Sequence, residues 1–138
     1  MAPRICILLG EIGPSGGAGT VLRHARGLAA DHGWDVTLAV RAGALSDVEG
    51  VRVVDFADAR RERFDLALST WWRTAYDLFE IRAGRRACFV QQLEERVYRD
   101  GDVERLGAAV VATLPVAFLT EAPWIAEVLG RLRPDADC

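Results

Sequence analysis

Short apolar runs recur along the chain and alternate with segments in which apolar residues repeat every three to four positions. The apolar runs predict strands at 4–9, 35–40, 51–54, 64–69, 86–91 and 115–119. The run Arg4–Leu9 is apolar on both faces, which is typical of a central strand in a parallel sheet covered by helices on both sides.

The segments between these runs have helical periodicity. Val21, Leu22, Ala25, Leu28 and Ala29 would share one face of a helix that ends near Gly33. Further helices are predicted at 70–81, 103–112 and 121–132, the last with a proline in its first turn. We expect 41–50 to form a loop or a brief helix, 57–63 a charged connection, and 94–100 irregular structure.

This alternation predicts one α/β domain over residues 1–138, with a Rossmann-like, doubly wound parallel sheet of about six to seven strands in a three-layer α/β/α sandwich. Ligands of such sheets bind at the carboxyl ends of the strands. The segments expected there are 10–19, 41–46, 69–72, 91–95 and 120–121.

A glycine-rich loop at 10–19 joins the first strand to the first helix, an arrangement that favours an anion next to the helix N-terminus. The alternative is a plain flexible turn. The chain has no lysine, so a phosphate-binding loop of the ATPase type is disfavoured. Leu22 occupies the position of the third glycine of a dinucleotide fingerprint, which disfavours that site as well. Ser15, Gly16 and Gly17 remain the candidate phosphate-binding residues.

Composition argues against several kinds of partner and ligand. The net charge of -3 argues against a general nucleic-acid partner, and the apolar runs are far shorter than the roughly 20 residues that span a bilayer. No pair among Cys6, Cys88 and Cys138 has metal-ligand spacing, and His24 and His32 are expected on the surface, so no metal is predicted. A reduced, cytoplasmic compartment fits this cysteine usage.

Four segments resemble parts of the N-terminal half of retaining GT-B glycosyltransferases. GGAGTVLRHARGLAADHGWDVTLAV is similar to the first βαβ unit of that family, and the resemblance implies that Gly16 and Gly17 approach the diphosphate of a nucleotide sugar. FDLALSTWWRTAYDL is similar to the family's fourth strand, which implies that Trp71 and Trp72 face the acceptor cleft. Two adjacent helical residues cannot both point inward, so we expect at least one of the tryptophans in the core.

The segment ACFVQQLEERVYRDGD resembles the family's FVQD-x-E-x-x-FY pattern. The resemblance implies that Gln91 and Glu94 take part in catalysis and that Gln92 and Tyr98 bind the acceptor. Gln91 cannot accept a proton and would orient hydroxyl groups. Glu94 would hold an acceptor hydroxyl or a basic neighbour, and the competing interpretation is a solvated surface charge.

The segment AFLTEAPWIAEVLGRLRPDADC resembles the family's sixth strand and following helix, after which a donor-binding domain with an E-x7-E motif would come. The resemblance therefore implies an acceptor-binding half that needs a second domain, uses no cofactor besides its nucleotide-sugar donor, and acts on a glycan, lipid-linked or small-molecule acceptor. Activity is not expected from the 138 residues alone. Weak contact with the inner face of a membrane is a further expectation. The alternatives are a free-standing nucleotide-binding or regulatory module and an NTPase with a degenerate phosphate loop.

Overall fold

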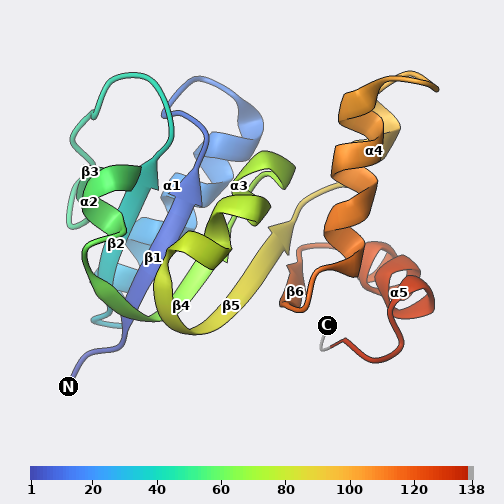
Figure 1. The fold of residues 1–138 in the computed structure, drawn as a ribbon. Coiled ribbons are helices and arrows are strands. Elements are labelled where there is room, and N and C mark those ends of the chain that lie inside the picture. Colours follow the sequence, from blue (N-terminus) through green and yellow to red (C-terminus); the bar gives the residue numbers. More distant parts are fainter. Residues whose placement is uncertain (137–138) are drawn as a thin grey trace.

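The computed structural model describes residues 1–136 and contains a six-stranded sheet in which all the paired strands run parallel. The strand order is β3-β2-β1-β4-β5-β6 (Figure 1). The strands are β1 (Arg4–Leu9), β2 (Asp35–Val40), β3 (Arg52–Asp55), β4 (Arg63–Ser69), β5 (Arg82–Val90) and β6 (Ala117–Thr120). The predicted α/β, Rossmann-like fold is confirmed.

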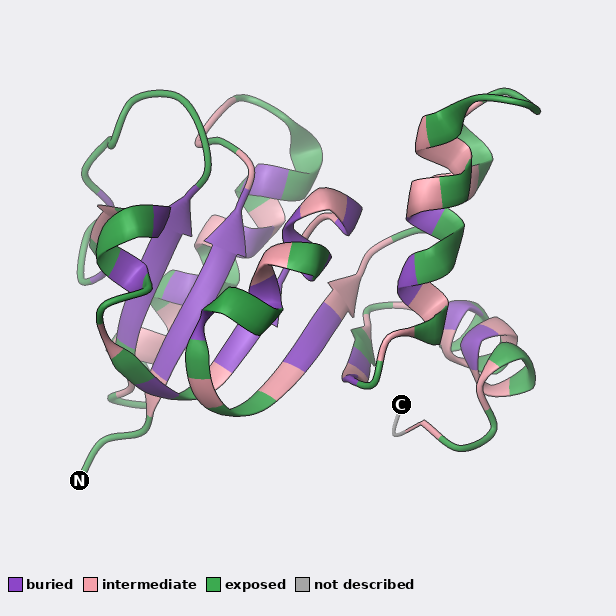
Figure 2. Cartoon of the chain, viewed as in Figure 1, coloured by how far each residue is buried: buried purple, intermediate pink, exposed green. Residues whose placement is uncertain are grey.

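The strand order changes direction between the neighbouring strands β1 and β4. β2 and β3 are added on one side of β1, whereas β4, β5 and β6 extend from the other. At such a switch point the connections after the two central strands turn to opposite faces of the sheet and leave a crevice at their carboxyl ends. Figure 2 shows the central strands almost wholly buried, so polar side chains reach this crevice mainly from the loops beyond the strands.

One face of the sheet packs against α1 (Gly16–Ala30). This helix buries Ala18, Val21 and Ala25 in the same cluster as Ile7 and Leu38. The spacing of these three helical residues gives an apolar stripe along one side, as the sequence predicts.

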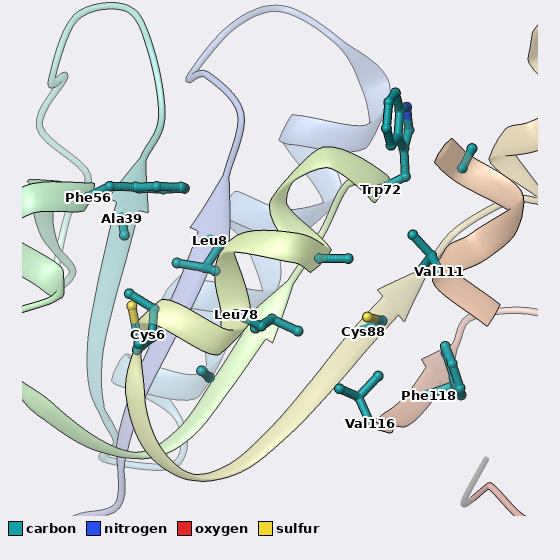
Figure 3. Packing of buried hydrophobic residues seen from close by; sticks show 14 of the residues in the cluster. Cys6, Leu8, Ala39, Phe56, Trp72, Leu78, Cys88, Val111, Val116 and Phe118 are labelled. Carbon is teal, nitrogen blue, oxygen red and sulfur yellow. The ribbon is translucent and has the colours of Figure 1, made fainter. Parts of the chain in front are cut away.

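The opposite face packs against the remaining helices. These are α2 (Phe56–Ala59), α3 (Trp72–Asp77) with the 3₁₀ turn η1 (Leu78–Glu80), α4 (Val103–Val110) with η3 (Val111–Thr113), and α5 (Pro123–Leu132). Figure 3 shows Phe56 of α2 beside Ala39 of β2, and Trp72 and Leu78 belong to the same buried cluster as Leu8 and Cys88. A further 3₁₀ turn, η2 (Glu94–Val97), follows β5.

Several element bounds differ from the sequence-based expectation, and three of the differences have a visible local cause. α1 begins at Gly16, because the Ser15 side chain caps it by accepting a hydrogen bond from Ala18 N over 3.2 Å. β5 begins at Arg82, four residues earlier than expected, because Arg82 and Ala83 already pair with Arg63 and Phe64 of β4. The charged connection contains the short helix α2, which is capped by Asp55.

The amino ends of the strands are joined by a polar network centred on Glu62. Its carboxylate accepts two hydrogen bonds from Arg52, both 2.7 Å long, and one of 2.8 Å from Arg4. Arg4 also donates to Asp35 over 3.0 Å and lies over the ring of Phe64. The network therefore links β1, β2 and β3 at the edge away from the carboxyl-end crevice.

Candidate functional site at the carboxyl edge of the sheet

A cleft of about 870 Å³ lies at the carboxyl edge of the sheet. It is lined by residues that follow β1, β2, β4 and β5 and by the first turn of α1. It brings together these residues predicted from the sequence: Ser15, Gly17, Trp71, Gln91, Gln92, Glu94 and Tyr98. Gly16 lies next to this set in the first turn of α1, and Trp72 lies behind the wall.

The N-terminus of α1 forms one wall of the cleft. The Ser15 cap satisfies the N–H of Ala18, whereas the N–H groups that open a helix have no acceptor within it. These groups and the helix dipole favour a negative charge at this point. Both glycines are exposed, so a ligand can approach the backbone closely.

Gln91 connects this wall to β5. Its side-chain amide donates to the carbonyl of Gly17 over 3.3 Å. A Cβ atom added to Gly17 would come within 3.0 Å of Gln91 Oε1, whereas one added to Gly16 would meet nothing within 4 Å. The two glycines therefore differ: Gly17 leaves room for Gln91, and Gly16 faces open space.

The adjacent tryptophans have separate environments. Trp72 is 8% exposed, and its indole N–H donates to the hydroxyl of Tyr98 over 2.9 Å. A Cβ on Gly107 would lie 2.8 Å from Trp72 Cζ3, so the glycine lets α4 pack against the indole. Trp71 is partly buried and lines the cleft, against Gly10. The expectation that at least one tryptophan belongs to the core is met by Trp72.

Glu94 is held at the boundary between the cleft and a second cavity. Its Oε2 accepts a hydrogen bond from the backbone N–H of Trp72 over 3.2 Å. Burial raises its pKa to about 7, the nearby Glu95 adds to this rise, and the hydrogen bond from Trp72 opposes it. A carboxyl group with this pKa can exchange a proton near neutral pH or accept a hydrogen bond from a sugar hydroxyl.

The second cavity has a volume of about 370 Å³ and lies between β5, β6 and the helices α4 and α5. Its lining is mainly apolar and includes Val90, Leu93 and Phe118. Gln92 and Glu94 line both cavities and therefore lie at the boundary between them, whereas Trp72 lines only the second one.

Two arginines line the cleft that the motifs did not single out. Arg41 follows β2 directly, and its Nη1 atom lies 3.7 Å from Oδ2 of Asp77. Arg73 lies over the rings of Trp71 and Trp72, with its guanidinium carbon 4.6 Å from the centroid of Trp72. The sequence places Arg41 directly after a predicted strand, which was enough to predict that it lies near the cleft. The location of Arg73 in the cleft could not be predicted, because it depends on how α3 packs.

The remaining expectations concern metals, membranes and the surface. Across residues 1–136, no group of three or more His, Cys, Asp or Glu side chains could hold a metal ion. In the same residues no helix has the length and apolar character needed to cross a membrane. His24 and His32 are exposed, Cys6 and Cys88 are buried free thiols, and Cys138 lies outside the described residues.

Comparison with models of known protein families and with curated protein sequences gives no match for this chain.

Proposed function

We propose that this chain is the N-terminal, acceptor-binding domain of a retaining GT-B glycosyltransferase, which transfers a sugar from a nucleotide diphosphate to a glycan, lipid-linked or small-molecule acceptor. We propose the cytoplasm as the compartment in which this domain acts. The observation that carries it is the cleft at the carboxyl edge, in which the first turn of α1 lies beside Trp71, Gln91, Gln92 and Glu94.

In this proposal the start of α1 lies next to the donor's diphosphate. The helix N-terminus favours the negative charge that grows on the leaving phosphate, and Gly16 and Gly17 leave space for it. The main donor site belongs to a second domain. The isolated 138 residues are therefore expected to catalyse no transfer.

The side opposite α1 binds the acceptor. Trp71 presents an aromatic ring on which a sugar can stack, and Gln91 and Gln92 offer amide groups to hydroxyls. Glu94 accepts a hydrogen bond from the hydroxyl that attacks the donor sugar. Tyr98, whose hydroxyl already accepts from Trp72, completes this wall.

A free-standing nucleotide-binding module is the second candidate, and the strand order favours it. The order β3-β2-β1-β4-β5-β6 is the one found in dinucleotide-binding sheets. In that case the isolated chain binds a nucleotide by itself. The reading frame beyond residue 138 separates the two candidates: a second domain with an E-x7-E motif supports the transferase, and a stop codon supports the module.

The decisive experiment is a transfer assay on the protein as its gene encodes it, with a panel of nucleotide sugars and acceptors read out by mass spectrometry. At pH 8, above the pKa of about 7, Glu94 is mainly ionised, so Glu94→Gln is expected to lower kcat/KM by about tenfold or more, because a neutral amide is a weaker acceptor than a carboxylate. Glu121→Gln, an exposed carboxylate that does not line the cleft, is the matched control. Equal kcat/KM values in both variants would contradict the assignment of Glu94.

A further inference from the structure

We propose that Arg41 and Arg73 form an anion-binding pair in the cleft, which receives a carboxylate or phosphate group carried by the acceptor. This inference rests on the proposed function, because it names the chemistry of the acceptor that the cleft would bind. It does not depend on the Gln91–Glu94 segment, since both arginines come from other parts of the chain.

Both guanidinium groups reach the cleft beside α3, that of Arg73 next to Glu104 of α4 and that of Arg41 next to Asp77. Arg73 and Asp77 are one turn apart on this helix, so their side chains lie on one face, with Cβ atoms roughly 6 Å apart. Arg41 reaches the same face from the end of β2, because its Nη1 lies 3.7 Å from Asp77 Oδ2. Both arginines also line the cleft.

Neither guanidinium uses its hydrogen-bond donors within residues 1–136. The ion pair of Arg41 with Asp77 is 3.7 Å long and that of Arg73 with Glu104 is 3.9 Å, whereas Arg52 binds Glu62 at 2.7 Å. Asp77 Oδ2 is buried and accepts no hydrogen bond from the described residues. The carboxylates therefore hold the two cations by charge and leave their N–H groups available to a ligand.

An anionic sugar fits this arrangement better than a neutral one. A guanidinium group presents paired N–H donors that match a carboxylate or phosphate. Arg73 lies 5.6 Å from the ring centroid of Trp71, so a sugar ring stacked on that indole would place an acidic substituent near the pair. The other ionisable groups of the cleft are Glu11 at its rim, Glu94 and Tyr98.

The test is an NMR titration of the ¹⁵N-labelled chain with sodium glucuronate, glucose 6-phosphate, glucose and uridine diphosphate. We expect an acidic sugar to shift the amides of Arg41 and residues 70–73, while glucose leaves them unchanged. Arg41→Gln should weaken this binding about tenfold or more, and Arg41→Lys by a smaller factor, because lysine keeps the charge without the paired donors. Arg61→Gln, at an exposed arginine outside the cleft, is the control.

Each outcome decides the inference. Equal binding of glucose and the acidic sugars, no binding of either acidic sugar, or an unchanged affinity in Arg41→Gln would overturn it. Shifts at these amides with uridine diphosphate alone would assign the pair to the donor and also overturn it. The proposed function is judged separately by the transfer assay: transfer to neutral acceptors with an unchanged KM in Arg41→Gln would refute only the anion-binding pair.

Discussion

The backbone N–H of Trp72 donates a hydrogen bond to Glu94 Oε2, and this contact joins the first turn of α3 to the segment after β5. The carboxyl group of Glu94 is partly buried, and burial raises its pKa to about 7 from an ordinary value of 4.5. The folded protein therefore holds a proton on Glu94 at pH values where the unfolded chain has lost it.

The pH dependence of stability follows from this difference. Between pH 4.5 and about 7 the folded state binds more protons at Glu94 than the unfolded state, so the free energy of unfolding falls as the pH rises through this window. Glu94→Gln removes the effect and should stabilise the chain at pH 8 by up to about 3 kcal/mol, with little change at pH 4. Urea unfolding at both pH values measures it, and an equal effect at the two pH values would contradict it.

The two tryptophans should respond differently to substitution. Trp72→Phe leaves the Tyr98 hydroxyl without its indole donor and opens space in the core, so we expect a loss of about 2 kcal/mol. Trp71→Phe should cost less than about 1 kcal/mol, because the side chain lines the cleft. Denaturant unfolding of both variants gives the comparison, and equal losses would refute the separation of the pair into core and cleft residues.

The paired glycines provide a matched test of the first turn of α1. Gly16→Ala meets open space and should stabilise the chain by up to about 1 kcal/mol through the unfolded state. Gly17→Ala should gain less, because its Cβ would displace Gln91 and break the hydrogen bond to the Gly17 carbonyl. Adding Gln91→Ala should remove the difference between the two alanine variants in thermal unfolding, and a difference that persists would contradict this account.

The buried thiols should be inert in the folded chain. Burial raises the pKa of Cys6 to about 12 and that of Cys88 to about 11, so almost no thiolate exists at pH 8. In a Cys138→Ser background, Ellman's reagent is expected to label no thiol until the chain is unfolded in guanidinium chloride. Rapid labelling of the native variant at pH 8 would show that these strands open more easily than their burial indicates.

The network at the amino edge should make the fold sensitive to acid. Arg52 and Arg4 hold the pKa of Glu62 below its usual value, so the stability that Glu62 contributes is present above about pH 4.5 and is lost as the pH falls through the lowered pKa. Glu62→Gln should cost about 1 kcal/mol at pH 7. Glu127→Gln, which affects only an exposed pair with Arg131, is the control, and equal losses would show that the network adds nothing.

The architecture could be predicted because its signals are local. β1 and β2 lie where their apolar runs place them, and α1 follows the spacing of Val21 and Ala25. The start of β5 was placed at Arg86 because residues 82–85 contain no apolar run, and their pairing with β4 is known only from the structure. Charged residues in strands depend on partners that are distant in sequence, and periodicity carries no information about them.

The candidate site was only partly accessible from sequence for the same reason. The rule that ligands gather at strand carboxyl ends brought Gln91 and Glu94 into consideration and extends naturally to Arg41. It could not reveal that Tyr98 accepts from Trp72, or that Asp77 holds Arg41, since those contacts depend on the packing of α3. The separate roles of Gly16 and Gly17 likewise required the position of the Gln91 side chain.

The Glu62 network joins the amino ends of the strands and the cleft occupies their carboxyl ends, so these ion pairs lie at the opposite edge of the sheet from the ligand contacts. Loop exchange can exploit this division. A chimaera that replaces residues 10–14 and 41–46 with those of another parallel α/β domain keeps the Ser15 cap and the contacts of Glu94 and Tyr98 with Trp72. It is expected to retain cooperative unfolding while taking on a new ligand. The scaffold is thereby suited to redesign of specificity by grafting, with the β1–β2–β3 edge left intact.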